Sequence, residues 1–336
     1  MNRRAIAYDP YLPGRSVEHV SGTAKLRDGG HADWAVVVKR TDGPGLRAAR
    51  RELNSYRIGL ADPAPDIGLR APALLAWDEG PEHVELWLEP LADELGGVWR
   101  ASRFGIAAAH IASWDARMQT FPLPPTFDSE DAWAERHGQP HRVHEGVAEV
   151  EAFRSVPGAS ELMALLDDEG FRRTEALITS TPARIERLAA YPQTLLHHDL
   201  VRSNLFAIGE ASTAAIDWEN VGRGPFGVDL TPLVIGSVRR GEASANDMVE
   251  IERVVIDAYV HALAEAGIDA EADVREAYRL AVGLRWHVVL GAIRNWLDAT
   301  ASRVRGSRPD ESRAESLRHL VPLARHILDT AERASA

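Results

Sequence analysis

Residues Leu195–Phe206 read LLHHDLVRSNLF, a polar segment between two apolar ones. The polar segment has the spacing His-x-Asp-x-x-x-x-Asn, with His197, Asp199 and Asn204 at the named positions. This pattern alone can arise by chance, so its interpretation depends on the second block that follows.

A second block follows at Ala214–Glu219, AAIDWE, where a short apolar strand ends in the carboxylate of Asp217. The two blocks together fit phosphoryl transfer. In that interpretation Asp199 accepts the proton of an attacking hydroxyl, while Asn204 and Asp217 supply the hard oxygen ligands that suit Mg²⁺. His197 would brace the loop by hydrogen bonding. The alternative is a pair of surface turns capped by Asp and Asn side chains.

A third block lies near the N-terminus, where Val36–Lys39 reads VVVK and ends an apolar strand with a lysine. A buried lysine needs a partner, because an unpaired charge is costly to bury. The helical stretch that follows offers Glu52. In kinases such a lysine contacts the α- and β-phosphates of the nucleotide and such a glutamate orients it. A strand lysine that snorkels to water is the alternative.

The three blocks, in this order, resemble the aminoglycoside phosphotransferase and choline kinase-like family. Pro192–Asp199 is similar to that family's approach to the catalytic loop, where a glycine often stands in place of His198. Ile216–Leu230 resembles its metal-binding block. The resemblance covers most of the chain and implies an α+β, bilobal, protein-kinase-like fold. It also implies that Asp229 begins a helix and braces the catalytic loop.

The same resemblance implies a nucleotide site for ATP or GTP, with Mg²⁺. Lys39 and Glu52 would hold its phosphates. The strand and hinge segment Leu86–Leu91 would offer backbone groups to the purine, which makes Glu89 and Leu91 nucleotide-binding residues.

The chain departs from the family in two places. There is no Gly-x-Gly-x-x-Gly motif, and the only candidates for the phosphate-covering loop are Gly14 and Gly22. The metal block reads Asp-Trp-Glu at 217–219, and no activation segment follows it. A protein substrate is therefore not expected.

The distribution of strand and helix patterns predicts two lobes. Residues 1–95 are strand-rich and are expected to bind the nucleotide, and residues 96–336 are mostly helical and are expected to hold the catalytic loop, metal block and acceptor pocket. A cleft between two lobes is the expected ligand site. The elements predicted are strands at Val17–Leu26, Trp34–Lys39, Ala73–Trp77 and Val84–Leu88, and helices at 46–60, Phe104–Met118, Asn246–Gly267, Ala272–Thr300 and Leu317–Arg333.

Composition limits the alternatives. The 336 residues include no cysteine, which excludes disulfides and suits a reducing cytoplasm. No secretory signal and no membrane-spanning stretch is evident. The formal net charge of −12 argues against a nucleic-acid partner. The expected partners are a nucleotide and a small-molecule acceptor, and no obligate protein partner is evident.

The acceptor stays open between two kinds of kinase. An aminoglycoside-like, cationic and hydroxylated acceptor is one, and an amino alcohol, sugar or amino sugar is the other. An inactive nucleotide-binding pseudokinase is an alternative of a different class. Acidic residues of the segment 126–170 either bind ammonium groups of the acceptor or form an ordinary acidic surface, namely Asp128, Glu130, Asp131, Glu135, Glu145, Glu149 and Glu151.

Overall fold

The computed structural model describes residues 2–6, 14–61, 67–96, 99–124, 127, 139–156, 169–209, 212–297 and 312–334. The chain forms two compact units. The first comprises Met1–Glu94, Pro122–Asp128 and Asn204–Val221, and the second comprises Leu95–Phe121, Ser129–Ser203 and Gly222–Ala336. The sequence predicted a division near residue 95 and placed the metal block with the helical part. In the structure the segment Asn204–Val221 joins the first unit, because its strand β9 pairs with β4.

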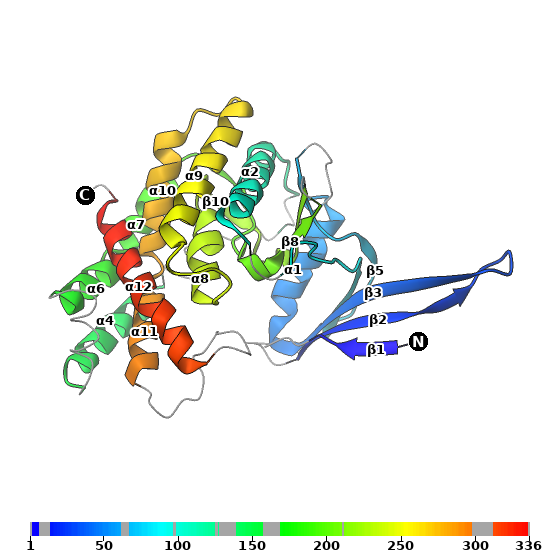
Figure 1. The fold of residues 1–336 in the computed structure, drawn as a ribbon, viewed down its shortest axis with the longest axis horizontal. Coiled ribbons are helices and arrows are strands. Elements are labelled where there is room, and N and C mark those ends of the chain that lie inside the picture. Colours follow the sequence, from blue (N-terminus) through cyan, green and yellow to red (C-terminus); the bar gives the residue numbers. More distant parts are fainter. Residues whose placement is uncertain are drawn as a thin grey trace. The chain divides into compact units, whose positions relative to one another are not determined.

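The first unit is built on an antiparallel sheet of order β1-β2-β3-β6-β5. Figure 1 shows that the β2–β3 hairpin extends beyond the other strands of this sheet. Its turn follows Leu26, whose N–H donates to Gly30 O, so the predicted hairpin is confirmed. The strands are β1 (Asn2–Ala5), β2 (Arg15–Lys25), β3 (His31–Asp42), β5 (Leu74–Glu79) and β6 (His83–Leu88).

Helix α1 (Leu46–Arg57) covers one face of this sheet. Its Ala49 and Leu53 pack against Leu86 and other alternate residues of β6, since successive strand residues point to opposite faces. Burying each large aliphatic side chain of this kind contributes about 2 kcal/mol. The helix ends before the predicted residue 60, because Gly59 adopts a positive φ of 79° and reverses the chain.

A second sheet in the first unit has the order β4-β9-β8 and comprises β4 (Leu69–Arg70), β8 (Leu205–Ile208) and β9 (Ser212–Ala215). Strands β8 and β9 are antiparallel, with Leu205 opposite Ala215. Residue Asn204 immediately precedes one strand and Asp217 closely follows the other. Both therefore lie at the same end of this hairpin.

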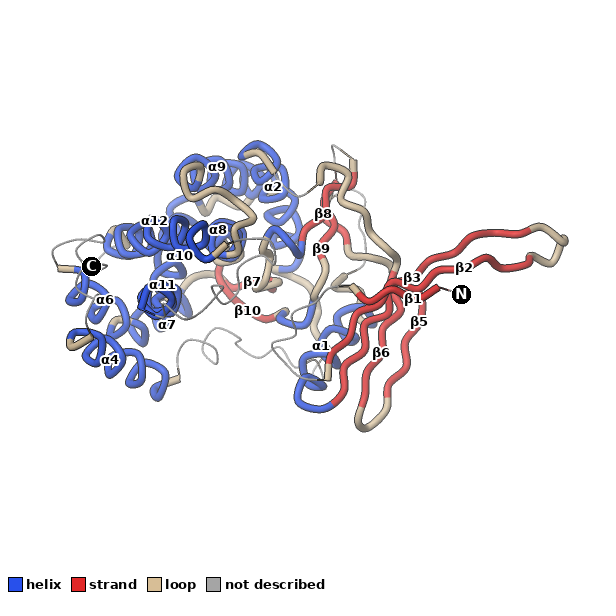
Figure 2. The backbone as a smooth tube through the Cα atoms, turned by 60° about the horizontal axis from the view of Figure 1, so that its bottom comes forward, coloured by secondary structure: helices blue, strands red, loops and turns tan. Residues whose placement is uncertain are grey.

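The second unit is mostly helical (Figure 2). Its two strands, β7 (Gln193–Leu196) and β10 (Gly222–Pro225), form an antiparallel pair. The helices are α2 (Ala101–Met118), α4 (Pro140–Arg154), α6 (Gly170–Thr179), α7 (Thr181–Ala190), α8 (Ser237–Arg239), α9 (Met248–Glu265), α10 (Glu271–Gly283), α11 (Trp286–Leu297) and α12 (Arg313–Glu332), with a π-helical turn at Pro232–Gly236 before α8. No helix in the described ranges is long and apolar enough to cross a membrane.

The single helix predicted over Ala272–Thr300 is wrong. The chain ends α10 at Gly283 and begins α11 at Trp286. A Cβ at Gly283 would lie 2.7 Å from the guanidinium of Arg184, so this glycine allows a close approach at the point where the helix stops. Apolar residues before and after the break have similar spacing, which is why periodicity did not reveal it.

Candidate active site

Three charged side chains meet in the interior of the first unit. Lys39 Nζ lies 2.6 Å from Glu52 Oε2 and 2.6 Å from Asp217 Oδ1. Strand β3 supplies the lysine, α1 supplies the glutamate, and the second residue after β9 supplies the aspartate. The predicted contact between Lys39 and Glu52 is present, and Asp217 joins it.

Burial and mutual attraction set the protonation of this group. The side chains of Lys39 and Glu52 are 7% and 1% exposed. Burial raises the pKa of Glu52 to about 7, although the neighbouring Lys39 works against this rise. Burial would lower the pKa of Lys39, but the carboxylates of Asp217 and Glu52 outweigh it and hold that pKa well above its usual range. Lys39 is thus a fixed cation.

Asn204 and Asp217, the predicted metal ligands, are held next to each other by the β8–β9 hairpin. The N–H of Ile216 donates to Asn204 O at 3.0 Å, directly before Asp217. An amide oxygen and a carboxylate are hard donors that fit Mg²⁺, which keeps several waters and takes few protein ligands. Within the part of the chain that the structure describes, no group of three or more His, Cys, Asp or Glu side chains is placed to hold a metal.

Asp217 adopts the left-handed conformation, with φ 64° and ψ 54°. The next residue holds this turn, because Trp218 is buried and its Nε1–H donates to Ala215 O at 2.8 Å. Ser55 Oγ of α1 lies 3.4 Å from Trp218 O. An uncommon backbone conformation supported by a buried tryptophan is how the chain aims the Asp217 carboxylate at Lys39.

A second ion pair lies beside this group and was not predicted. Arg15 Nη2 is 2.7 Å from Glu219 Oε2, and Nη1 donates to Oε1 at 3.0 Å. Glu219 contributes to raising the pKa values of both Lys39 and Glu52. We call Arg15, Lys39, Glu52, Asp217 and Glu219 the charge cluster.

Glu89 and Leu91 follow β6 in the first unit. The carboxylate of Glu89 accepts from Arg70 at 2.7 and 3.1 Å and from the N–H of Ala73 at 3.1 Å. Its own N–H donates to Ala73 O at 2.9 Å. Because this N–H is already bonded, the backbone group of Glu89 that can bond to a nucleotide base is its carbonyl.

The loop that contains Asp199 belongs to the second unit. Asp229, fully buried, accepts the N–H of His197 at 2.7 Å and the N–H of His198 at 2.8 Å. This is the bracing contact expected from the resemblance. The N–H of Asp199 donates to Nδ1 of His197 at 3.3 Å, so His197 also braces the loop. His198 has a φ of 66°, a conformation that glycine adopts readily and other residues rarely.

Behind Asp229 lies a buried polar chain that the sequence did not reveal. Tyr259 on α9 donates to Asp115 Oδ2 on α2 at 2.6 Å and accepts the N–H of Gly227 at 3.2 Å. Gly227 precedes Asp229 by two residues and has a φ of 89°. Thr194 Oγ1 on β7 donates to Asp115 O at 2.6 Å. Burial raises the pKa of Asp115 well above its usual range.

The far end of the catalytic loop is held by other contacts. The N–H of Arg202 donates to Ser237 Oγ and the N–H of Ser203 donates to Glu242 Oε2, each at 3.0 Å. The Arg202 guanidinium lies 4.1 Å from the centre of the Trp99 ring, within the range of a cation–π contact. The loop is thus anchored on both sides of Asp199.

A sequence model of the phosphotransferase enzyme family matches residues 17–280. The chain belongs to this family. No curated protein sequence matches it. The family assignment confirms the resemblance seen in the sequence, and the match spans the Lys39, Asp199 and Asp217 blocks.

Solved structures with the same kinase-like fold agree with the family assignment. An aminoglycoside phosphotransferase from Alicyclobacillus acidocaldarius subsp. acidocaldarius DSM 446 is 12% identical, with 98% of this chain and 91% of that chain covered and a TM-score of 0.58. An amicoumacin kinase solved with AMP-PNP and Ca²⁺ is 12% identical, with 97% and 88% covered and a TM-score of 0.57. An ethanolamine kinase from Plasmodium vivax is 10% identical, with 97% and 81% covered and a TM-score of 0.53.

The predicted site residues of this phosphotransferase are divided between the two units. Lys39, Glu52 and Asp217 are in direct contact, and Asn204 lies beside them across the hairpin. Glu89 and Leu91 also belong to the first unit, whereas Asp199 belongs to the second. Arg15, Glu219, Asp115 and Tyr259 were missed. The only sequence signals for the first two were their places beside Gly14 and in the Asp-Trp-Glu block.

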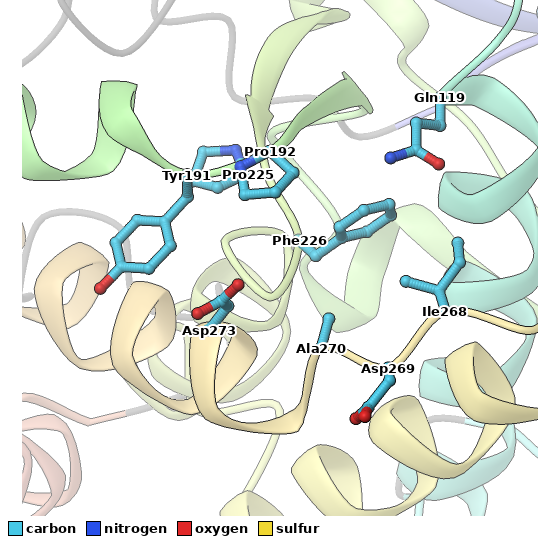
Figure 3. Close-up of a pocket in the computed structure, with 9 residues that line it drawn as sticks. All are labelled: Gln119, Tyr191, Pro192, Pro225, Phe226, Ile268, Asp269, Ala270 and Asp273. Atoms are coloured by element: carbon cyan, nitrogen blue, oxygen red, sulfur yellow. The ribbon is translucent and has the colours of Figure 1, made fainter.

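The second unit also contains a cavity of about 100 Å³ (Figure 3). Phe226, Tyr191 and the carboxylate-bearing Asp269 and Asp273 are among its lining residues. Pro192 and Pro225, at the end of the β7–β10 pair, also line it. The catalytic loop begins beyond the opposite end of β7, so the cavity is separated from Asp199 by the length of this strand.

Proposed function

We propose that this phosphotransferase is a kinase that transfers the terminal phosphoryl group of ATP or GTP to a hydroxyl of a small molecule, with Mg²⁺. The observation that carries the proposal is the buried contact of Lys39 with both Glu52 and Asp217. A lysine held between two carboxylates, one of them beside an asparagine at the end of a hairpin, combines a phosphate-binding cation with oxygen ligands for a metal.

Each residue has a distinct task in this proposal. Lys39, oriented by Glu52, binds the α- and β-phosphates, and the backbone of Glu89 and Leu91 binds the purine. Asn204 and Asp217 hold Mg²⁺, which neutralises charge on the phosphates when bound. These groups act by positioning and by charge neutralisation, which supply most of the rate in phosphoryl transfer.

Asp199 acts on the acceptor. Its carboxylate accepts the proton of the hydroxyl as the hydroxyl oxygen forms a bond to the γ-phosphorus and the bond from that phosphorus to the bridging oxygen breaks. The products are the phosphorylated acceptor and the nucleoside diphosphate. Asp229, by accepting two N–H groups of the loop, fixes the direction from which Asp199 approaches the hydroxyl.

The proposed acceptor is aminoglycoside-like, and an amino alcohol, sugar or amino sugar is the alternative. Structural neighbours that are named aminoglycoside phosphotransferase and amicoumacin kinase favour the first, and one that is named ethanolamine kinase favours the second. The acidic segment does little to decide. Glu149 forms an ion pair with Arg294 and Glu151 with Arg154, so each already has an arginine partner. Asp128, Glu130, Asp131 and Glu135 lie outside the described residues.

The test is a coupled assay of nucleotide consumption with purified protein, ATP or GTP, Mg²⁺ and a panel of acceptors. The panel holds aminoglycosides, other hydroxylated antibiotics, choline, ethanolamine and amino sugars. Turnover with one acceptor, lost by about 10³-fold in Asp199→Ala while nucleotide affinity is retained, would support the proposal. Undiminished turnover in that variant would exclude the mechanism. Tight nucleotide binding without turnover on any acceptor would favour the pseudokinase alternative.

A further inference from the structure

The first unit holds a second cation on the same face of the sheet as Lys39. In the β2–β3 register Arg15 lies opposite Thr41 and Val17 lies opposite Lys39. Directly opposed residues and alternate residues of a strand share a face, so Arg15 and Lys39 share one. The two positions lie on neighbouring strands, two residues apart along the strand direction, which places them about 8 Å apart at about 3.4 Å per residue and about 4.8 Å between strands.

Arg15 occupies the position where a phosphate-covering loop would end. It is the first residue of β2 and follows Gly14, while the chain lacks the Gly-x-Gly-x-x-Gly motif whose backbone would cover the phosphates. Its side chain is only 5% exposed and lies beside Gly45, the residue before α1. A Cβ at Gly45 would come within 2.9 Å of Arg15 Nε, so the glycine leaves room for the Arg15 side chain in its observed position.

Glu219, the ion-pair partner of Arg15, connects this arginine to Lys39 and to the predicted metal ligand Asp217. Glu219 follows Asp217 by two residues and interacts electrostatically with Lys39. Both of its carboxylate oxygens lie close to the Arg15 guanidinium, and Nη1 donates a hydrogen bond to Oε1. A guanidinium that binds a carboxylate through two parallel contacts can bind two phosphate oxygens in the same way. Glu219 thus holds Arg15 in a geometry suited to phosphate.

We propose that Arg15 is a second phosphate-binding cation of the nucleotide site, and that Glu219 holds its side chain ready until the phosphates replace the carboxylate. The proposal rests on the proposed function, because it takes the surroundings of Lys39 to be the phosphate site. It assigns to a side chain the task that a glycine-rich loop would perform with its backbone.

The experiment compares four variants by calorimetric titration with Mg²⁺–ATP, Mg²⁺–GTP and adenosine. Arg15→Gln removes the proposed ligand, and Glu219→Gln removes its holder. Arg40→Gln is the matched control, because Arg40 neighbours Lys39 on β3 but points to the other face and is 44% exposed. Arg15→Lys keeps the charge and loses the two-pronged geometry.

A phosphate ligand and a purely structural ion pair predict different results. If Arg15 binds phosphate, Arg15→Gln raises the Kd of the triphosphate about 10-fold or more and leaves adenosine binding unchanged. Glu219→Gln, which loses only the holder, then raises that Kd by much less than Arg15→Gln does, Arg15→Lys falls in between, and Arg40→Gln has no effect. If the pair is only structural, Arg15→Gln and Glu219→Gln weaken binding and lower the thermal midpoint alike. That result would overturn the inference.

Failure of the inference can be told from failure of the proposed function. Wild-type protein that binds the triphosphate while Arg15→Gln binds it equally well overturns the inference alone. Wild-type protein that binds neither Mg²⁺–ATP nor Mg²⁺–GTP overturns the proposed function and the inference with it.

Discussion

Lys39 in the first unit and Asp199 in the second are held by different kinds of contact. Lys39 touches two carboxylates at 2.6 Å each, and a further ion pair, Arg15 with Glu219, lies beside it. The loop around Asp199 is held by backbone N–H groups that donate to one buried carboxyl, that of Asp229. Ion pairs fix the side chain of Lys39, whereas hydrogen bonds from backbone N–H groups to Asp229 fix the loop around Asp199.

Because of this difference, substitutions at the two sites should have different effects. Removal of one charge from the cluster leaves buried opposite charges uncompensated, and the energetic cost is large. Removal of the acceptor from the catalytic loop leaves two buried donors unpaired and lets the loop shift, which affects turnover more than nucleotide binding. Substitutions in the two units should therefore separate binding from turnover.

The largest expected effect is that of Lys39→Met. Glu52 and Asp217 lose their shared cation, and breaking a buried ion pair from one side costs about 3–5 kcal/mol of unfolding free energy. The affinity for Mg²⁺–ATP should also fall, by about 10-fold or more. Urea denaturation and calorimetric titration measure the two quantities. An unchanged affinity would remove Lys39 from the phosphate site.

Asp229→Ala, in contrast to Lys39→Met, should lower turnover and leave nucleotide affinity nearly unchanged. Two buried N–H groups lose their acceptor, which costs about 3 kcal/mol of unfolding free energy. Misplacement of Asp199 should lower kcat by about 10²-fold, with nucleotide affinity nearly unchanged. Steady-state kinetics and titration with nucleotide test this, with the exposed Asp269→Ala as control. Equal losses in affinity and kcat would contradict the separation between the units.

The pH dependence of stability sharpens the comparison further. Burial raises the pKa of Asp229 to about 7, above the value near 4 in an unfolded chain. The folded protein binds this proton more tightly, so the contribution to stability is present at low pH and is lost as the pH rises through about 7. Asn does not titrate there. Asp229→Asn should therefore cost about 2–3 kcal/mol more at pH 5 than at pH 8. Urea denaturation at the two pH values measures this, and an equal cost at both would contradict it.

The smallest effect on stability and turnover is expected in the buried chain of hydrogen bonds formed by Asp115, Tyr259 and Gly227. Tyr259→Phe removes a hydroxyl that joins Asp115 to the N–H of Gly227, and the unfolding free energy should fall by about 1–2 kcal/mol. The turn that carries Asp229 should loosen, so kcat should fall a few-fold. Tyr278→Phe is the matched control. Tyr278 is about as buried as Tyr259, but it belongs to α10 and interacts with Glu252 rather than with Asp115. A kcat that falls as much in the control would deny Tyr259 a positioning role.

Local patterns were sufficient for much of the first unit. The turn after Leu26, the helix that begins at Leu46 and the strands of the β5–β6 hairpin were predicted because each depends on residues close in the chain. The contact between Lys39 and Glu52 was also predicted, since only 13 residues separate them and a buried lysine requires a nearby carboxylate.

Contacts between distant segments escaped prediction. Arg15 and Glu219 are 204 residues apart, and Asp115 and Tyr259 are 144 apart. Each of these residues has many equally plausible neighbours in the sequence, and only the packed chain selects one. Asp115 lies in an apolar helical pattern in which a single carboxyl gives no sign of its partner.

The sequence by itself determined the chemical blocks and their order: a strand lysine, a helix glutamate, a loop with Asp199 and Asn204, and a strand that Asp217 closely follows. These are short-range patterns, and a family model reads them over residues 17–280. The tertiary structure alone decided that Asn204–Val221 joins the first unit, that the long apolar stretch from Ala272 breaks after Gly283, and that Arg15 meets Glu219. Strand pairing, close approach at a glycine and buried ion pairs all depend on which distant surfaces meet, and that information is present only once the chain has packed.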